Sequence, residues 1–579
     1  MLSAEKELKE SIGNTTRRSL LRNAALMGAA AVAAPTIAMP SEAAAERAAA
    51  SSFANVLEQP AKVTVFLEDK SIVTLTRSGD SWREGALTID TERTKRGLQL
   101  RLAAPGSSVL RVHFRWRAKL PAATLRVLGD AWERSYGELG WREVVPERAL
   151  PWYFLTFDGH KTHGYGVAVG PAAFAFWLCD GEGVSLWLDV RNGGNGVLLG
   201  ERSLPMVTVI AREGETGEAP MTAARALCHL MSPSPKKSSG PIYGSNDWYY
   251  AYGKNTPAGI LRDADLVAEL APAGGASPFS IIDMGWEDQA KFPDMTALAA
   301  SIRSKGVRPG IWIRPMQPVV KADPRLLLPA NRFATAQDAE GNPSYDPTIP
   351  EGLDAALARV RQVKAYQFEL IKHDFSTFDF LGQWGFTMSA SPARGGWNFS
   401  DRSRTSAEII RSFYEAISHV AGDSLVIGCN TIGHIGAGLF DAQRIGDDVS
   451  GKMWERSRRM GVNTLAFRLA QHQAFFAADA DCVPLTAAIP WSFTRQWLDL
   501  VAKTGTVLLI SPELGAVNAE AKAAIKAAFA IAAKGGQELT PVDWLDTHTP
   551  RRWQAAAASG GAVEQYDWLG DQGAYPFEV

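Results

Sequence analysis

The sequence predicts a multidomain α/β protein with a central (β/α)8 barrel, an N-terminal antiparallel β-sandwich and a short C-terminal β tail. Three observations support this fold class. The chain has 579 residues, which is too long for a single hydrophobic core. From about residue 63 to residue 210, short runs alternate between apolar and polar residues, a pattern typical of antiparallel strands. Beyond residue 240, strand-like and helix-like segments alternate, as the repeats of a parallel barrel do.

The predicted domain limits follow these changes in pattern. The β-sandwich is expected over residues 60–231, starting with the strand Lys62–Leu67. The stretch Ser232–Gly240 is rich in Pro, Ser and Gly, which predicts a linker. The barrel is expected over residues 240–515, and residues 516–579 hold its last helix and a short β region.

Eight segments of the expected barrel are predicted to be buried strands, and capping signals mark helices between them. Thr256 precedes a proline, and Thr405–Glu408 is a capping box. The predicted strands are Pro241–Asn246, Phe279–Met284, Val307–Ile313, Phe368–Asp374, Ser424–Asn430, Asp441–Ile445, Asp479–Pro484 and Val507–Ser511.

Residues 1–45 resemble a twin-arginine export signal. Arg17 and Arg18 are followed by an Ala-rich apolar stretch from Ala24 to Met39, with small residues beyond it that supply cleavage sites. A basic tail with a short apolar helix is the alternative. We expect an exported protein, located in a bacterial periplasm. No other segment reaches the roughly twenty apolar residues of a membrane span.

The composition excludes several classes of protein. The formal net charge of −2 and the absence of basic clusters argue against nucleic-acid binding. The nine histidines form neither an HExxH motif nor a His/Cys cluster, so no metal or other cofactor is expected. Four cysteines allow three disulfide pairings in an oxidising compartment, and the sequence does not choose between them. They are Cys179, Cys228, Cys429 and Cys482.

Polar groups and tryptophans follow the predicted strands at the point where each strand ends. In a (β/α)8 barrel these positions face the active-site mouth. Paired carboxylates in an aromatic-rich pocket are suited to cleaving a glycosidic bond through an oxocarbenium-like transition state. The groups are Asn246-Asp247-Trp248, Asp283 with Trp286, Trp312 with Arg314, Lys372-His373-Asp374, Cys429-Asn430, Arg444 with Asp447-Asp448, and Asp479 with Asp481.

These strand ends also resemble the successive motifs of the melibiases, the retaining α-galactosidases of glycoside hydrolase families 36 and 27. The resemblance covers residues 242–511 and implies an exo-glycoside hydrolase. Such an enzyme works by double displacement through a covalent glycosyl-aspartate, on an oligosaccharide or glycoconjugate. The matching blocks are Tyr243–Tyr249, Ile281–Trp286, Gly310–Pro315, Ile371–Asp374, Arg444–Asp448, Ala478–Cys482 and Thr504–Ser511.

The resemblance also assigns roles to residues. Asp374 matches the nucleophile of a Lys-x-Asp motif, and Asp448 matches the acid/base, four residues after Arg444. Asp447 is the alternative acid/base, but neighbouring residues of an extended segment face opposite ways, so we expect only one of the two to fill this role and favour Asp448. The expected substrate-binding residues are Trp248, Asp283, Trp286, Trp312, Lys372, Cys429, Arg444 and Asp447, although an inert buried thiol is an equal possibility for the cysteine.

One position departs from the family pattern. Melibiases carry Asp-Asp-Gly-Trp after the second strand, whereas this chain has Asp283-Met284-Gly285-Trp286. Losing a hydrogen-bonding group changes sugar recognition, which favours other glycones such as a β-L-arabinopyranoside or an α-N-acetylgalactosaminide. The sequence is also compatible with a transglycosylase or a non-catalytic carbohydrate-binding protein. His373 is expected to pack away from the site, and the segment Ser376–Arg404 is expected to cap it.

Overall fold

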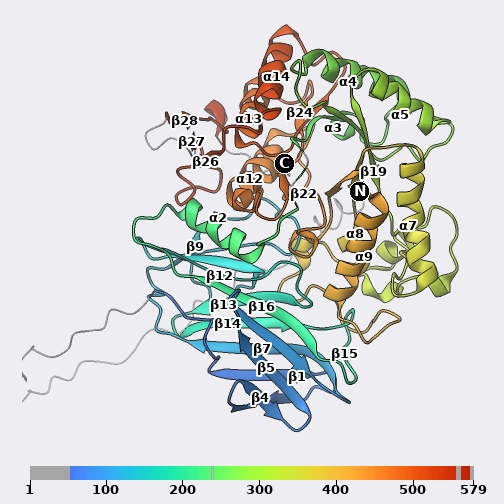
Figure 1. The fold of residues 1–579 in the computed structure, drawn as a ribbon. Helices are drawn as coiled ribbons and strands as arrows, with labels where there is room; N and C mark the ends of the chain where they lie inside the picture. The colour runs from blue at the N-terminus through green and yellow to red at the C-terminus, as the bar shows by residue number, and fades with distance from the viewer. Residues whose placement is uncertain (1–51, 237, 239, 556–561, 574–579) are drawn as a thin grey trace, which may run out of the picture. The chain divides into compact units, whose positions relative to one another are not determined.

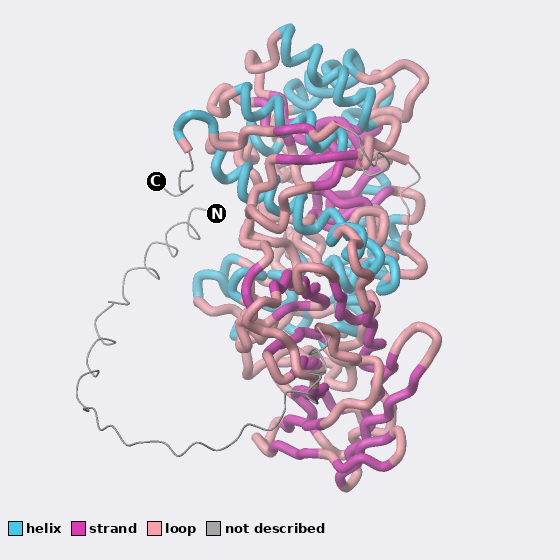
Figure 2. Tube along the Cα trace, turned by 90° about the vertical axis from the view of Figure 1, so that its left-hand side faces the viewer, coloured by secondary structure: helices cyan, strands magenta, loops and turns pink. Residues whose placement is uncertain are grey.

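The computed structural model describes residues 52–236, 238, 240–555 and 562–573. The predicted export signal lies outside these residues. The described chain contains two antiparallel sheets, one parallel sheet of nine strands and a small antiparallel sheet of three strands. Figure 1 and Figure 2 show the strands of the two larger antiparallel sheets gathered at one end of the described chain and most helices at the other. The protein is therefore a multidomain α/β protein; the limits of the individual domains stay a prediction.

The first two sheets form the N-terminal part of the described chain. One has the strand order β10-β13-β14-β7-β1-β2, with β15 also paired to β7; the other has the order β3-β4-β5-β6-β16-β12-β11-β8-β9. Their strands are β1 (Lys62–Leu67), β2 (Ile72–Thr74), β3 (Thr76–Ser78), β4 (Ser81–Glu84), β5 (Leu87–Arg93), β6 (Leu98–Ala103), β7 (Ser108–Arg117), β8 (Arg126–Gly129), β9 (Arg142–Glu143), β10 (Leu150–Pro151), β11 (Tyr153–Phe157), β12 (Thr162–Val167), β13 (Phe174–Asp180), β14 (Gly183–Asp189), β15 (Val197–Leu198) and β16 (Leu204–Arg212).

Side chains on the inner faces of these two sheets form a shared core. Strand β6 alternates between buried and partly exposed residues, as its period-2 pattern predicts. Phe154 of β11 and Trp177 of β13, which belong to different sheets, have ring centroids 5.8 Å apart. Helix α2 (Pro220–Met231) covers β12. Gly164 of that strand is needed there, because a Cβ atom would lie 2.7 Å from the Leu227 side chain.

The parallel sheet has the order β23-β22-β21-β20-β19-β18-β17-β25-β24. All eight predicted barrel segments contribute to it, but the seventh forms two strands rather than one. β23 and β24 lie at opposite ends of this order although only Ala480–Cys482 separates them in the chain. The strands are β17 (Tyr243–Asn246), β18 (Phe279–Ile282), β19 (Arg308–Ile313), β20 (Leu370–His373), β21 (Leu425–Gly428), β22 (Ala442–Arg444), β23 (Ala477–Asp479), β24 (Val483–Leu485) and β25 (Leu508–Pro512).

Helices alternate with the parallel strands, and Figure 1 shows α4, α5, α7 and α9 following one another around the outside of that sheet. Both predicted capping signals are confirmed: the Thr256 hydroxyl accepts from Gly259 N at 3.1 Å, and Thr405 with Glu408 forms a capping box. The α-helices after α2 are α3 (Trp248–Ala251), α4 (Pro257–Leu270), α5 (Met295–Ser304), α6 (Ala336–Gly341), α7 (Pro350–Ala365), α8 (Ser376–Leu381), α9 (Ser406–Ala421), α10 (Gly433–Gly436), α11 (Trp454–Ser457), α12 (Thr464–Arg468), α13 (Trp491–Thr504) and α14 (Ala519–Ala532).

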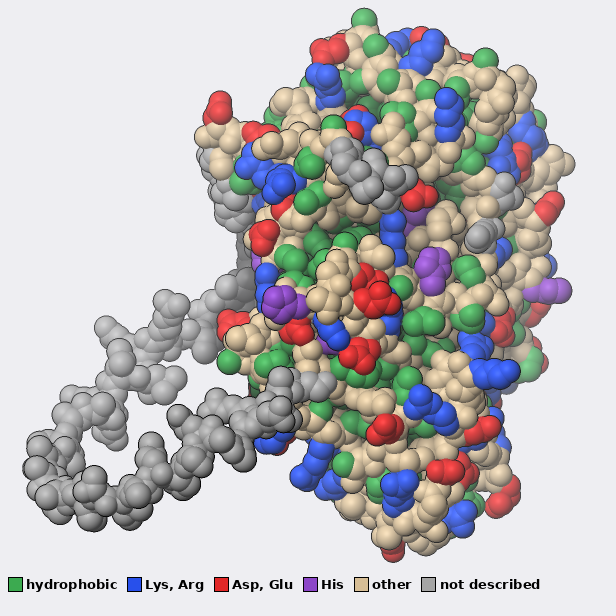
Figure 3. All heavy atoms as spheres, turned by 60° about the vertical axis from the view of Figure 1, so that its left-hand side comes forward, with side chains coloured by type: hydrophobic (Ala, Val, Ile, Leu, Met, Phe, Trp, Pro, Cys, Tyr) green, Lys and Arg blue, Asp and Glu red, His purple; other side chains and the backbone are tan. Residues whose placement is uncertain are grey.

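The C-terminal sheet contains β26 (Leu539–Pro541), β27 (Arg552–Ala555) and β28 (Glu564–Gln565). All four cysteines are buried free thiols. Acidic and basic side chains are interspersed on the face shown in Figure 3, in keeping with the small net charge. Among the described helices, none is long and apolar enough to cross a membrane.

Candidate functional site

The carboxylate of Asp374 is held at the end of β20 by three N–H groups. Oδ2 accepts from the Trp312 indole at 2.9 Å. Oδ1 accepts from the backbone N–H groups of Phe375 at 2.7 Å and Asn430 at 3.1 Å. The next residue, Phe375, has a φ of 65°, so the chain turns sharply directly after the carboxylate. Three donors to a carboxylate with 9% residue exposure fix its direction.

A buried ion pair lies beside this carboxylate. Lys372 Nζ donates to Asp283 Oδ2 at 2.7 Å, and the Asn246 amide donates to the same oxygen at 2.8 Å. Burial lowers the pKa of Lys372, but the attraction of Asp283 outweighs it and the net pKa is well above its ordinary value. The structure thus brings Asp283, Lys372 and Asp374 together at adjoining strand ends, as the sequence predicts.

The second pair of predicted carboxylates shares a set of arginines. Arg444 Nη2 donates to Asp448 Oδ1 at 2.9 Å and to Asp481 Oδ2 at 2.6 Å. Asp447 forms ion pairs with Arg134 at 3.1 Å and with Arg456 at 2.8 Å. The Asp448 side chain retains 25% of its exposure, against 16% for Asp447. Asp448 is therefore the more accessible of the two.

The charges around Asp448 set its protonation. Burial raises the pKa of its carboxyl, but the guanidinium groups of Arg444 and Arg134 outweigh burial and lower the pKa to about 2. For Asp481 the balance is reversed: burial raises the pKa, and the nearby Asp448 carboxylate adds to the rise. Tyr249 Oη also donates to Asp481 Oδ2. Within this pair the surrounding arginines therefore favour the charge on Asp448 over Asp481.

Two further strand-end carboxyls have raised pKa values. Burial and the neighbouring Asp283 carboxylate raise the pKa of Asp247 to about 8. Asp247 accepts from Asp283 N at 2.8 Å and from the Asn255 amide at 3.0 Å. Burial raises the pKa of Asp479 to about 6. The site therefore combines carboxyls that favour opposite protonation states, a feature common at catalytic centres.

The predicted tryptophans differ in their surroundings. Trp312 contacts Asp374 directly, and Trp248 lies at the start of α3 with 7% exposure. Trp286 has no exposed surface, and its indole donates to the Trp312 carbonyl at 2.8 Å, so its ring packs beneath the site. Met284 is half-buried and packs with Tyr252 against a hydrophobic cluster that includes Trp248. The apolar side chain of Met284 directly follows Asp283 in the chain.

The thiol and imidazole groups near these strand ends are buried. Cys429 Sγ lies 3.8 Å from Arg444 Nη1, and burial raises the pKa of this thiol well above its ordinary value. His373 packs among the rings of Phe413, Tyr414 and Phe440, as expected of a residue on the opposite face of β20. Burial lowers the pKa of His373 to about 3. His373 is thus a neutral packing residue.

Sequence reasoning missed the contribution of the N-terminal sheets. Between β8 and β9 the chain leaves its own sheet, and residues 130–136 reach the strand ends. Arg134 pairs with Asp447 at 3.1 Å and approaches Asp448 at 3.5 Å. Glu133 accepts from the Asn430 amide and from Gly385 N. The only signal in the sequence is the charged and aromatic run from Trp132 to Tyr136, which does not reveal its partners.

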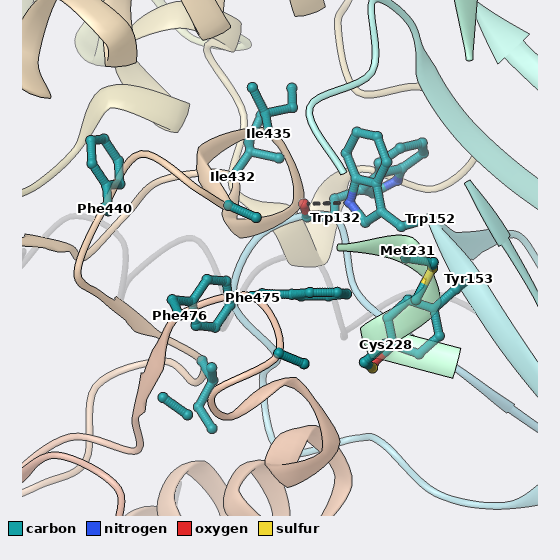
Figure 4. Packing of buried hydrophobic residues seen from close by; sticks show 14 of the residues in the cluster. Trp132, Trp152, Tyr153, Cys228, Met231, Ile432, Ile435, Phe440, Phe475 and Phe476 are labelled. Atoms are coloured by element: carbon teal, nitrogen blue, oxygen red, sulfur yellow. Dashed lines mark hydrogen bonds between the residues drawn. The ribbon is translucent and has the colours of Figure 1, made fainter. Parts of the chain in front are cut away.

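Aromatic packing holds this segment in place (Figure 4). The indoles of Trp132 and Trp152 meet edge to face with centroids 5.2 Å apart, and Trp152 Nε1 donates to the Trp132 carbonyl at 2.9 Å. His434 of α10, which follows the parallel strand β21, stacks on Trp152 with ring centroids 4.8 Å apart. Of the segment expected to cap the site, the part around Trp384 lies within 5.7 Å of the Arg134 guanidinium. Its later part, around Trp397, bonds to Gly194 of the N-terminal sheets.

Solved structures share this arrangement of sheets. The α-galactosidase TtGalA from Thermus thermophilus, solved with p-nitrophenyl α-D-galactopyranoside, is 17% identical, with 87% of this chain and 99% of that chain covered and a TM-score of 0.54. The family 36 α-galactosidase AgaB from Geobacillus stearothermophilus is 12% identical, with coverages of 82% and 75% and a TM-score of 0.56. The chain has the fold of the family 36 α-galactosidases.

The α-galactosidase from Lactobacillus brevis gives the same result, with 12% identity, coverages of 86% and 77%, and a TM-score of 0.56. No family sequence model matches the chain, and no curated protein sequence matches it. The likeness to the α-galactosidases is therefore one of fold, and it agrees with the resemblance seen in the strand-end motifs.

Proposed function

We propose that the protein is a retaining exo-glycoside hydrolase of the α-galactosidase type, with Asp374 as nucleophile and Asp448 as acid/base. The observation that carries the proposal is that two carboxylates, Asp374 and Asp448, interact with the same lysine, Lys372, but are held by different kinds of donor. Asp374 is oriented by three N–H donors, whereas Asp448 is held by arginines and is partly exposed. Both carboxylates interact electrostatically with Lys372, which supports the proposal that they share one site.

The proposed reaction has two steps. Asp374 attacks the anomeric carbon while the bond to the leaving oxygen breaks, and Asp448 gives that oxygen a proton. A glycosyl ester of Asp374 results. Asp448 then removes a proton from water, which attacks the anomeric carbon and releases Asp374. Because each of the two steps inverts the anomeric carbon, the first sugar product should have the configuration of the substrate. The two carboxyl groups of such a retaining site are expected to lie about 5 to 5.5 Å apart.

The scaffold that we propose for this chemistry is a closed (β/α)8 barrel. β23 pairs with β22 and β24 pairs with β25, so the interrupted seventh strand reaches both ends of the parallel sheet. Val507 N also donates to the Ala478 carbonyl at 3.0 Å. This hydrogen bond links the start of the eighth strand to β23 and supports closure. The proposed active site then lies at the C-terminal mouth, as in other barrels of this type.

The proposed acid must carry a proton when the substrate binds. The arginines hold the pKa of Asp448 at about 2, so the fraction of protonated acid rises as the pH falls towards that value. We therefore expect hydrolysis of substrates with poor leaving groups to be fastest on the acidic side of neutrality. Substrates whose leaving group needs no proton should show a much weaker dependence.

The glycone that we propose is one with an apolar or missing group where galactose carries its hydroxymethyl. Met284 replaces a carboxylate of the melibiase motif and packs with Tyr252 against the same hydrophobic cluster, so we infer that the two form an apolar wall of the site. A hydroxyl facing this wall would lack an acceptor, at a cost of about 1 to 3 kcal/mol. A β-L-arabinopyranoside lacks the hydroxymethyl group and fits this wall better than an α-galactoside. An α-N-acetylgalactosaminide keeps the hydroxymethyl group and differs from galactose at C2, so it is the alternative glycone for a wall that faces C2.

The proposed function is tested with a panel of nitrophenyl glycosides. The panel contains α-galactoside, β-L-arabinopyranoside, α-N-acetylgalactosaminide, α-glucoside and α-xyloside. Proton NMR of the first-formed anomer reports retention, and a fluorinated glycoside should trap a covalent adduct on the peptide that contains Asp374. Absence of hydrolysis across the panel, or an inverted product, contradicts the proposal. Transfer to added sugar in preference to water would instead identify a transglycosylase.

We also propose that the protein is exported through the twin-arginine signal in residues 1–45. The support is the sequence pattern of Arg17 and Arg18 before an Ala-rich apolar stretch. Replacing both arginines with lysine should retain the protein in the cytoplasm, while the unchanged chain is recovered from the periplasm. Export of the double variant would contradict this route.

A further inference from the structure

The segment between β8 and β9 joins the end of a parallel strand. Ser135 forms a parallel bridge with Gly446. Ser135 N donates to the Ile445 carbonyl at 3.0 Å, and Asp447 N donates back to the Ser135 carbonyl at 2.8 Å. These bonds extend the sheet immediately before Asp448. The backbone that presents the proposed acid/base is therefore paired with a segment from the N-terminal sheets.

Buried polar contacts tie this segment to the barrel from both sides. Arg468 of α12 donates to Asp130 Oδ1 at 2.6 Å, to the Glu133 carbonyl at 2.6 Å and to the Ile445 carbonyl at 2.8 Å. The Glu133 side chain, 1% exposed, accepts from the Asn430 amide. Asn430 N also donates to Asp374 at 3.1 Å, so the segment touches residues that orient both proposed catalytic carboxylates.

Arg134 supplies the charge of the segment. Its side chain is 6% exposed, and its two terminal nitrogens lie 3.1 Å from Asp447 Oδ1 and 3.5 Å from Asp448 Oδ1. The guanidinium carbon lies 5.9 Å from the centre of the Tyr136 ring and 5.7 Å from that of Trp384. A guanidinium that is confined between rings and carboxylates has little freedom to swing away.

We propose that residues 130–136 are a positioning segment through which the N-terminal sheets orient the proposed acid/base, with Arg134 as the positioning residue. The orienting contacts are independent of the reaction, whereas the effect on catalysis rests on the proposed function. The N-terminal part of the chain then has a direct role at the site, because removing Arg134 takes one cation from each of Asp447 and Asp448 and leaves them to Arg456 and Arg444.

The pH dependence of the reaction should report this role. Arg134 lowers the pKa of Asp448, so its removal should raise that pKa. The alkaline limb of kcat/KM would then move to higher pH, by about one unit or more. The other charged and titratable groups that face Asp448 are Arg444 of β22, Lys372 of β20, Arg456 of α11, Tyr249 of α3, Asp481 after β23, and Tyr252 and Asp447.

The experiment compares the full-length protein with Arg134→Gln, Arg134→Lys and Arg117→Gln. Arg117 is an exposed arginine of β7 and serves as the matched control. Hydrogen exchange of the peptide that covers residues 445–451 measures how firmly the backbone around Asp447 and Asp448 is held. We expect faster exchange in Arg134→Gln, partial recovery in Arg134→Lys and no change in the control.

Activity is measured over pH on the best substrate of the nitrophenyl panel. An upward shift of the alkaline limb in Arg134→Gln, largely reversed in Arg134→Lys, supports the positioning role. Unchanged exchange and an unchanged pH profile in Arg134→Gln would overturn it. If the unchanged protein cleaves no glycoside, the proposed function fails, and the exchange data alone decide whether the segment holds this backbone. If Arg134→Gln does not fold, Arg134→Lys takes its place in both measurements.

Discussion

Replacing Asp448 with Asn should separate the acid/base role from a structural one. The substitution leaves Arg444 paired with Asp481 at 2.6 Å and Arg134 paired with Asp447 at 3.1 Å, so no arginine loses its last carboxylate. We therefore expect the free energy of unfolding to fall by only about 1 kcal/mol. Loss of a general acid costs 10²- to 10⁴-fold in rate, which corresponds to about 3 to 5 kcal/mol of transition-state stabilisation.

The neighbouring substitution, Asp447→Asn, should have the opposite profile. Asp447 is held by Arg134 at 3.1 Å and Arg456 at 2.8 Å, and the latter bond is lost or weakened in the variant. We expect a loss of about 1 to 3 kcal/mol of stability with a smaller effect on the chemical step. The two variants therefore differ in which property they damage.

The assay uses two glycosides of the preferred sugar, one with a dinitrophenyl and one with an alkyl leaving group. Asp448→Asn should retain cleavage of the first and lose the second, because only the alkyl group needs a proton. Azide should then yield a glycosyl azide of retained configuration, whereas Asp374→Asn should be inactive on both substrates. The reasoning is refuted if Asp447→Asn shows the leaving-group dependence and azide rescue while Asp448→Asn does not.

Three further changes test the environment of the site. Met284→Asp should raise activity on α-galactoside; efficient cleavage by the unchanged protein with no gain in the variant would show that another residue supplies the acceptor. Burial raises the pKa of Asp247 to about 8, so the folded state holds a proton that the unfolded state loses above about pH 4. The free energy of unfolding therefore falls as the pH rises from about 4 to about 8. In urea unfolding, the difference in free energy of unfolding between Asp247→Asn and the unchanged protein should therefore move in favour of the variant by roughly 2 to 4 kcal/mol from pH 5 to pH 8. An equal difference at the two pH values contradicts this. Asp283→Asn leaves Lys372 buried without its partner and should cost about 3 to 5 kcal/mol, with part of the loss recovered when Lys372→Met is added; additive losses in the double variant would show that the pair is not coupled.

Much of the fold followed from local patterns in the sequence. The predicted parallel strands were found because buried strands are short apolar runs between turn signals. The break in the seventh strand could not be predicted. Asp481 adopts a φ of 75°, which is unusual for a residue other than glycine, and its carboxylate accepts from Arg444 and Val449 N. These long-range bonds favour a conformation that no local propensity encodes.

The candidate site, like the fold, could be predicted from the sequence only in part. Asp283, Lys372 and Asp374 could be grouped from sequence because the ends of neighbouring parallel strands lie at one edge of the sheet. Arg134 could not, because its partners lie more than 300 residues further along the chain and its own surroundings predict only a loop between strands. Trp286 was predicted to bind substrate because it belongs to the motif, but the structure leaves its ring no exposed surface. This burial depends on the packing of neighbouring helices, which the motif does not encode.

The way in which each carboxylate is held accounts for the different roles that we propose for Asp374 and Asp448. Among the described residues, the hydrogen bonds to Asp374 come from neutral N–H groups, and no ion pair reaches it. The carboxylate is oriented without a direct cation, which suits the proposed role of stabilising a developing oxocarbenium ion and then bonding to it. Asp448 shares Arg444 with Asp481 at 2.6 Å, and Arg134 lies 3.5 Å away. Arg134 lies farther from Asp448 than Arg444 does, at 3.5 Å against 2.9 Å, so the pKa of Asp448 depends on how closely the segment from the N-terminal sheets holds its guanidinium to the carboxylate.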